Sequence, residues 1–396
     1  MSEKREVVIL SGVRTAIGDY GGSLKDFAPA DLAAKVIKQA VARAKVDPKE
    51  VGHCVFGNVI HTEARDMYLS RLACVNGGLP HETPALTVNR LCGSGMQAIV
   101  SAAQHILLGD TDCAVAGGAE SMSRGGYLLP TLRWGARMSN ATVVDMMVGA
   151  LTDPFDTVHM GITAENVAAK CSLKREEQDA YAVESHRRAA AAQSKGHFKD
   201  QILPIEIKTK KGSTFFDTDE HVRSDATIEG MAKLKAVFQK ENGTVTAGNA
   251  SGINDAAAAV VLMDGSVAQS KGLQPIARMI AYAHSALDPK IMGLGPVSAV
   301  KKVMEKAKLK LSDLDLIESN EAFAAQAMGV TKELGLDRDR VNPNGGAIAL
   351  GHPIGATGCI LTVKAIYELQ RSGGRYALVT MCIGGGQGIA AVFERM

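Results

Sequence analysis

Cys92 is the residue whose position most favours covalent chemistry. It lies between an apolar stretch, Ala85 to Leu91, which we predict to be a strand, and Gly93-Ser-Gly95, which opens an Ala-rich helix. Glycines at this junction let the backbone turn sharply and approach a ligand closely. A thiol at a helix start meets the positive end of the helix dipole, which favours the thiolate, and unpaired amide hydrogens there can stabilise an oxyanion. The position indicates a nucleophile, with a buried thiol that merely packs as the alternative.

His352 is the candidate base for this thiol. It lies in the glycine-rich segment Gly351-His-Pro-Ile-Gly355, where Pro353 restricts the backbone. A histidine that meets a cysteine forms a nucleophile and base pair. The alternative is a core histidine whose hydrogen bonds are satisfied locally.

Cys382 and Asn320 are the remaining candidates for chemistry. Cys382 follows what we take to be the last apolar strand and precedes Ile383-Gly-Gly-Gly386, a predicted flexible loop with amides free to bind an anion. A second thiolate is a suitable base for removing an α-proton from a thioester when its pKa lies near neutrality. Asn320 ends another predicted strand, where its amide can position a water or donate to an enolate oxygen. A buried strand residue and a turn asparagine are the respective alternatives.

Metal binding and dinucleotide binding are rival uses of these segments. The candidate Cys and His residues lack the short spacing of zinc ligands, so we expect no metal site. Gly93-Ser-Gly95 followed by Ala98 fits the loose dinucleotide-binding pattern, but no acidic residue ends the next strand. A dehydrogenase that uses a nicotinamide cofactor is therefore a weak alternative.

The elements that must position these residues occur twice. In the first half a predicted strand ends at Asn58, and Cys92 follows 34 residues later, before a helix. In the second half a strand ends at Asn320, and His352 follows 32 residues later, before Gly355-Ala-Thr-Gly358, which also opens a helix. Such repetition indicates two similar α/β domains. Packed together, they would bring Cys92 and His352 to one shared centre.

A more charged stretch interrupts the repeat between about Ser121 and Ala250. We interpret it as an insertion with binding functions, containing a helix from Glu165 through Arg188. Apolar character returns at Asp255 to Met263, a predicted strand that completes the first domain.

Size and composition are typical of a large α/β enzyme. The 396 residues suit two or three domains, and 44 basic against 42 acidic residues leave a formal charge of +2, so we expect no nucleic-acid or membrane partner. We find neither a signal segment nor an apolar run of membrane-spanning length. Seven scattered cysteines indicate reduced thiols, and a cytoplasmic location is expected.

Five motifs, in this order, resemble those of the thiolase family: Asn89-Arg-Leu-Cys-Gly-Ser-Gly95, Asn320-Glu-Ala-Phe323, Asn342-Pro-Asn-Gly-Gly346, Gly351-His-Pro-Ile-Gly-Ala-Thr-Gly358 and Cys382-Ile-Gly-Gly-Gly386. The resemblance spans nearly the whole chain. It implies an α/β thiolase fold with two pseudo-symmetric, layered α/β/α/β/α domains and an inserted loop domain. We place the N-terminal domain at residues 1–120 plus 251–274, the loop domain, for CoA binding and oligomerisation, at 121–250, and the C-terminal domain at 275–396.

The resemblance also implies a role for each candidate. Cys92 would be the acylated nucleophile, His352 the residue that activates it, and Cys382 the acid/base that acts on the second substrate. Asn320 would hold a water that forms one oxyanion hole with His352, and the backbone amides of Cys92 and Gly384 would form the other. The implied reaction is the reversible Claisen condensation of two acyl-CoA molecules through an S-acyl cysteine, giving acetoacetyl-CoA from acetyl-CoA and extending to 3-oxovaleryl-CoA.

Coenzyme A thioesters, acetyl-CoA and 3-oxoacyl-CoA, are thus the expected substrates, and no permanently bound cofactor is expected. Arg223 is the expected partner of the CoA phosphates, because arginine binds phosphate well. The segment from His159 to Glu165 resembles a loop of biosynthetic, tetrameric thiolases, which implies a homotetramer. Among thiolases the chain resembles bacterial β-ketothiolases that feed polyhydroxyalkanoate synthesis. The positions that match CoA contacts are Leu151, His159, Met160, Arg223, Ala250, Ser251, Met292 and Phe323.

Two related classes are less consistent with these motifs. The 3-oxoacyl synthases typically pair their cysteine with two histidines, whereas this chain has Cys382 in a Cys-Ile-Gly motif. A CoA-binding or lipid-binding carrier that kept the fold would be expected to have lost a catalytic position, yet all four are present.

Overall fold

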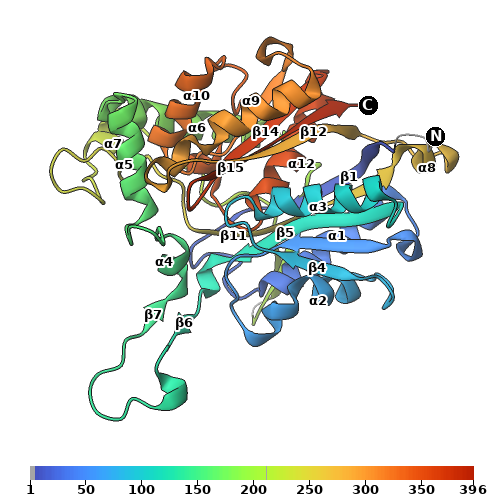
Figure 1. The fold of residues 1–396 in the computed structure, drawn as a ribbon, viewed down its shortest axis with the longest axis horizontal. Helices are drawn as coiled ribbons and strands as arrows, with labels where there is room; N and C mark the ends of the chain where they lie inside the picture. Colours follow the sequence, from blue (N-terminus) through green and yellow to red (C-terminus); the bar gives the residue numbers. More distant parts are fainter. Residues whose placement is uncertain (1–4, 211) are drawn as a thin grey trace.

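The computed structural model describes residues 5–210 and 212–396, which are built around a mixed 11-stranded β-sheet with two halves, called here the first and the second sheet (Figure 1). The strands of the first sheet are β1 (Val7–Thr15), β3 (His53–Gly57), β4 (Ala85–Val88), β5 (Cys113–Ser121) and β11 (Asn254–Asp264), with the short β2 (Gly18–Asp19) and β8 (Ile202–Leu203) beside them. Those of the second sheet are β12 (Ala277–Ala286), β13 (Leu316–Ser319), β14 (Tyr376–Ile383) and β15 (Gln387–Arg395). The sheets meet edge to edge where β1 pairs with β12.

The two sheets repeat one topology. β3 is parallel to β5, which is antiparallel to β11; likewise β13 is parallel to β14, which is antiparallel to β15. Equivalent helices precede equivalent strands: α1 (Pro29–Ala44) and α9 (Gly295–Ala307) lead to β3 and β13, whereas α3 (Ser94–Leu108) and α12 (Thr357–Ser372) lead to β5 and β14. The α/β class and the pseudo-symmetry predicted from the sequence are therefore confirmed.

Helices and sheets form five layers that the two halves share. α12 contacts α3 and strands of both sheets, so these two helices form the middle layer. α1 packs on the first sheet and α9 on the second, and they form the outer layers. The middle helices approach closely, because a Cβ on Gly95 would lie 2.8 Å from the backbone nitrogen of Cys359 and one on Gly358 would lie 2.3 Å from that of Met96. Glycine is required where the first turns of α3 and α12 cross.

α3 also corrects an expectation about apolar runs. The 18-residue stretch Leu91–Leu108 has a mean hydropathy of 1.2 and is long and apolar enough to cross a membrane by composition alone, so the statement that the sequence has no such run is wrong. However, 56% of the stretch is buried inside the fold, where α3 packs on β5, β3 and α12. Packing within the core accounts for its apolar character.

The segment between β5 and β11 carries an arm and a group of helices. The arm contains β6 (Tyr127–Leu128) and β7 (Val144–Asp145) and projects from the body in Figure 1, followed by α4 (Met146–Ala150), α5 (Met160–Lys170), α6 (Arg175–Ser194), the hairpin β9 (Ile205–Thr209) and β10 (Gly212–Phe216), and α7 (Ile228–Ala232). The predicted single helix from Glu165 through Arg188 is wrong. The chain breaks between α5 and α6, where Ser172 has a left-handed φ of 53°. Our domain boundaries remain a prediction.

Short elements complete the described part of the chain. The other α-helices are α2 (Leu69–Asn76), α8 (Gly265–Ser270), α10 (Ala324–Leu334) and α11 (Ala347–Leu350). The 3₁₀ helices are η1 (Pro48–Glu50), η2 (Ala64–Tyr68), η3 (Met122–Arg124), η4 (Leu132–Trp134), η5 (Pro289–Leu294) and η6 (Leu311–Asp313).

A buried ion pair anchors the inserted segment to β1. Both side chains, Arg14 and Asp219, are fully buried, and two guanidinium nitrogens lie 2.6 and 2.9 Å from the two carboxylate oxygens. Arg14 also donates to Gln201, and Asp219 also accepts from the backbone amide of Ile17. The guanidinium and the carboxylate are thus both paired, as the burial of a charge requires.

Candidate active site

Cys92 lies in a tight turn between β4 and α3. β4 ends earlier than the predicted strand, and Leu91 adopts a left-handed φ of 45°. A bulky residue in this conformation costs about 1–2 kcal/mol. Side chains hold the turn: Ser94 Oγ accepts from the amide of Arg90 and donates to the carbonyl of Leu91, and Asn89 Oδ1 accepts from the amide of Leu91. The local sequence thereby stabilises a turn that the backbone alone disfavours.

Opposing effects act on the Cys92 thiol. The backbone amides of Gly384 and of Cys92 itself donate to its sulfur and lower the thiol pKa. Desolvation of this half-buried thiol acts in the opposite direction and is larger, and the charge of Glu120 adds to it, so the pKa rises to about 11. The expectation that the helix start favours a thiolate is wrong for the resting protein, because desolvation outweighs the amides. The thiol is protonated at neutral pH and requires a base to become a nucleophile.

His352 is buried in the segment before α12. Burial lowers its pKa to about 4, so the imidazole is neutral at pH 7 and can accept a proton. Its Nδ1 lies 2.7 Å from Thr357 Oγ, and its Nε2 lies 3.4 Å from the side-chain nitrogen of Asn320. Its backbone amide donates to Asn254 Oδ1 at 2.9 Å. These contacts, from three separate segments, fix both the ring and its backbone.

Cys382 lies within β14, so the expectation that it follows the last strand is wrong. β15 returns antiparallel to β14 and pairs Cys382 with Gly388. The three glycines between the strands form a hairpin turn rather than a flexible loop, with left-handed φ angles of 79° at Gly385 and 81° at Gly386. Burial, and then the neighbouring Cys92, raise the pKa of the Cys382 thiol far above its ordinary value, so the condition that a thiolate base has a pKa near neutrality is not met in the resting protein.

Asn320 follows β13 and connects the neighbouring strands. Its backbone amide donates to the carbonyl of Thr380 at 3.0 Å, two residues before Cys382. Its side chain is fully buried, with the amide nitrogen directed at His352. Within the described part of the chain, Oδ1 of Asn320 has no hydrogen-bond partner. A buried acceptor of this kind normally has one, so the atom is available to a small donor such as water.

Glu120, which the sequence reasoning did not select, connects the segments around Cys92 and His352. Its carboxylate accepts from the amides of Val59, Ile60 and Gly355 and from the side chain of Asn58, at 2.8–3.1 Å. Burial raises its pKa to about 8. The signal that could have identified it is Asn58, the counterpart of Asn320 in the internal repeat.

An apolar wall surrounds Cys382 and contains several predicted CoA contacts. Met160, Met292 and Phe323 pack with Cys382 in one buried cluster, and Ala250 lies against it. Ala250 also forms a bridge with Phe323, and Met160 donates to the carbonyl of Leu151. Ser251, another predicted CoA contact, is held by a hydrogen bond from its backbone amide to the carbonyl of Ala322.

Phe238 belongs to this wall although it is in no recognised motif. Its ring stacks on His159 with 4.5 Å between centroids and meets Phe323 edge to face at 6.4 Å. A Cβ on Gly161 would lie 2.1 Å from the Phe238 ring, so the ring depends on a glycine for its position. The sequence reasoning missed Phe238 because a lone aromatic residue in a charged segment carries no periodic signal.

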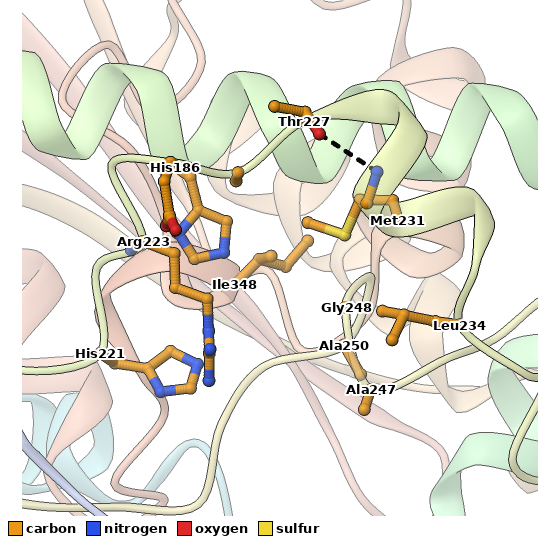
Figure 2. A pocket seen from close by; sticks show the side chains of 13 residues that line it. His186, His221, Arg223, Thr227, Met231, Leu234, Ala247, Gly248, Ala250 and Ile348 are labelled. Atoms are coloured by element: carbon orange, nitrogen blue, oxygen red, sulfur yellow. Dashed lines mark hydrogen bonds between the residues drawn. The ribbon is translucent and has the colours of Figure 1, made fainter.

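A pocket of about 360 Å³ adjoins the wall at Ala250. Figure 2 shows the Arg223 side chain extending alongside His221, near His186. The amide of Arg223 donates to His186 Nδ1, and burial, followed by the charges of His221 and Arg223, lowers the pKa of His186 to about 4. Neither histidine was selected from the sequence, because neither lies in a motif. The pocket is lined by His186, His221, Arg223, Asp225, Ala226, Thr227, Gly230, Met231, Leu234, Ala247, Gly248, Ala250 and Ile348.

Comparisons with known proteins agree with this geometry. The family models of the thiolase N-terminal domain and the thiolase C-terminal domain match residues 7–266 and 273–395. The chain is 67% identical to beta-ketothiolase BktB of Cupriavidus necator, over 99% of this chain and 100% of the relative. The solved Bacillus anthracis acetyl-CoA acetyltransferase superposes with a TM-score of 0.97 at 45% identity, covering 100% of both chains. Human mitochondrial 3-ketoacyl-CoA thiolase in complex with CoA gives 0.96 at 44% identity, covering 99% of this chain and 98% of that one. The chain therefore belongs to the thiolase family, as its motifs predicted.

Proposed function

We propose that the protein is a β-ketothiolase that joins two acetyl-CoA molecules into acetoacetyl-CoA and CoA and catalyses the reverse thiolysis. The observation that carries the proposal is the polar centre around Cys92, where two backbone amides meet the sulfur and a neutral, buried histidine belongs to the adjoining half. The names of the relatives agree with it, since one is a beta-ketothiolase and another an acetyl-CoA acetyltransferase.

The first half-reaction acetylates Cys92. His352 takes the thiol proton on Nε2, and the sulfur attacks the carbonyl carbon of acetyl-CoA. The amides of Cys92 and Gly384 receive the negative charge that develops on the carbonyl oxygen. The C–S bond to CoA then breaks, and the CoA thiolate takes the proton of Cys382, which leaves His352 protonated on Nε2 and Cys382 as a thiolate. The raised pKa of Cys92 makes the base necessary, because the free thiolate is scarce at pH 7.

The second half-reaction forms the carbon–carbon bond. Cys382 removes an α-proton from a second acetyl-CoA, whose enolate oxygen is stabilised by His352 and a water held by Asn320. The unpartnered Oδ1 of Asn320 supports this use of water. The carbanion attacks the acetyl carbonyl on Cys92, the C–S bond breaks, and the Cys92 thiolate takes its proton back from His352. The raised pKa keeps Cys382 protonated in the resting protein, so it becomes a base only after it has given its proton to the departing CoA.

The protein is proposed to bind both substrates through their coenzyme A portion. Arg223 and the pocket around it would receive the phosphates, whereas Met160, Met292, Phe323 and Phe238 would border the pantetheine and acyl groups. The solved human relative was crystallised with CoA, which supports this class of ligand. No other cofactor enters the mechanism. Propionyl-CoA is a further proposed substrate, giving 3-oxovaleryl-CoA.

Two assays test the function. With acetyl-CoA alone, the purified protein should release free thiol and form acetoacetyl-CoA; with CoA and 3-oxoacyl-CoA of increasing chain length, it should show thiolysis that is greatest for short chains. Failure of both reactions in a folded protein refutes the proposal. Activity confined to long chains would keep the thiolase chemistry but refute the acetyl-CoA specificity.

Assembly and cellular role extend the proposal. The β6–β7 arm exposes large apolar side chains, with Trp134 89% and Met138 90% exposed, which supports its burial against other copies in a homotetramer. Light scattering on the wild type and on a Trp134→Ser/Met138→Ser variant tests this, because the variant should dissociate. We further propose that the enzyme works in the cytoplasm and supplies 3-oxoacyl-CoA for polyhydroxyalkanoate synthesis, as its sequence resemblance implies.

A further inference from the structure

We propose that Thr357 is a positioning residue that keeps the ring proton of His352 on Nδ1 and so leaves Nε2 free to accept the proton of Cys92. This inference rests on the proposed function, in which His352 is the base. Thr357 is the first residue of α12 and is buried, with 2% of its surface exposed.

The Thr357 hydroxyl makes two contacts that determine the direction of its proton. Its Oγ lies 2.9 Å from the carbonyl oxygen of Pro353 and 2.7 Å from Nδ1 of His352. A carbonyl oxygen can only accept, so the single hydroxyl proton points to Pro353. The hydroxyl oxygen then faces Nδ1 as an acceptor, which requires a proton on Nδ1. A neutral imidazole has one ring proton, so Nε2 carries a lone pair.

The other side of the ring gives the same assignment. Nε2 lies 3.4 Å from the side-chain nitrogen of Asn320, which can only donate. A proton on Nε2 would set two donors against each other. Thr357 and Asn320 therefore select the same tautomer from opposite edges of the imidazole.

The backbone of His352 is held independently of Thr357. Its amide donates to Asn254 Oδ1 at 2.9 Å, and Asn254 donates in turn to the carbonyl of Gly18 at 3.1 Å. Loss of the threonine hydroxyl should consequently change the protonation of the ring more than its position. Those anchors make the proposed role separable from a general effect on folding.

The Thr357 hydroxyl oxygen also accepts from Nδ1 of His352 after the Cys92 proton has been transferred. When the S–H bond of Cys92 breaks, its electron pair stays on sulfur and the proton forms the Nε2–H bond. The resulting imidazolium still donates from Nδ1 to Thr357, a bond that strengthens because the donor is now charged. A neutral ring whose proton is already on Nε2 cannot accept the Cys92 proton there. Without the Thr357 hydroxyl more rings adopt this form, so a smaller fraction of the enzyme can be acetylated.

The test compares Thr357→Val, which keeps the branched shape without the hydroxyl, with Thr357→Ser, which keeps the hydroxyl. Single-turnover acetylation of Cys92 by acetyl-CoA is followed by quenched flow and mass spectrometry, and thermal unfolding is recorded for each variant. The valine variant should be slower at saturating acetyl-CoA on the order of 10- to 100-fold, the range for a lost hydrogen bond to a charged group. Its half-saturating concentration should not change, and the serine variant should retain nearly the wild-type rate.

Each outcome decides the inference. A valine variant as fast as the wild type overturns it, and so does a serine variant as slow as the valine variant, because a packing role would then suffice. If the valine variant does not fold, Thr357→Ala replaces it, and equal rates for the alanine and serine variants overturn the inference. A wild-type protein that is never acetylated refutes the proposed function itself, which distinguishes the two failures.

Discussion

His352→Gln tests whether the resting thiol depends on a base. With a Cys92 pKa of about 11, roughly one thiol in 10⁴ is ionised at pH 7. His352, with a pKa of about 4, is neutral and able to accept a proton throughout the range above that value. Wild-type acetylation should therefore be nearly independent of pH between about 6 and 8. The variant must use thiolate that forms without the base, so its rate at pH 7 should fall by about 10²- to 10⁴-fold.

The pH dependence is the sharper part of this prediction. Ionisation of a thiol with a raised pKa increases about tenfold per pH unit below that pKa, so the rate of the variant should rise with that slope from pH 7 towards 10, and its deficit should shrink. The assay is single-turnover acetylation of Cys92 measured across this range, with His81→Gln, at an exposed position, as the matched control. A variant with the flat wild-type profile, or with less than about a tenfold loss at pH 7, contradicts the reasoning.

Three further predictions concern separate parts of the molecule. Cys382→Ser should still acetylate Cys92 but lose condensation by at least about 10²-fold, because a serine hydroxyl can protonate the departing CoA but does not form the base that removes the α-proton; a product assay with unimpaired condensation would rule out the assigned role. Arg223→Gln should raise the KM for acetyl-CoA about tenfold with little change in kcat, and an unchanged KM would remove Arg223 from the CoA site. Arg14→Met should lower the free energy of unfolding in urea by about 3–5 kcal/mol by leaving Asp219 charged and unpaired, whereas adding Asp219→Asn should recover part of the loss; additive losses would contradict the pairing argument.

The internal repeat could be predicted because each half of the chain contains the same short sequence patterns. The glycines after Cys92 and His352 mark helix starts that cross closely, and the close approach at Gly95 and Gly358 explains why no other residue type serves there. These glycines can be recognised as helix starts without knowing which distant residues lie beside them. The same holds for β11, whose uninterrupted small and apolar residues suit a strand buried on both faces.

What failed depended on tertiary contacts. The break between α5 and α6 follows residues that favour helix, but Lys332 of α10 donates to the carbonyl of Cys171 and helps end α5 there. Cys382 was expected to follow the last strand, because the antiparallel pairing of β14 with β15, which includes Cys382, cannot be seen in the sequence. The helix start was expected to lower the thiol pKa, yet desolvation of the half-buried Cys92, which the sequence does not reveal, raises it.

The CoA pocket shows a different limit of sequence reasoning. Arg223 was selected from the family resemblance, but His186 and His221 come to it from other segments and lie in no motif. Phe238 is likewise identified as part of the site only because its ring stacks on that of His159. Residues that contribute only through folded proximity require the structure to identify them.

Identification of the acylated atom tests the account most directly. The wild-type protein should be mixed with acetyl-CoA in the absence of free CoA, quenched with acid and digested, and the peptides examined by mass spectrometry. We expect one acetyl group per chain, on the sulfur of Cys92. An acetyl group on another cysteine, or active enzyme that turns over without any thioester on Cys92, would contradict the central claim.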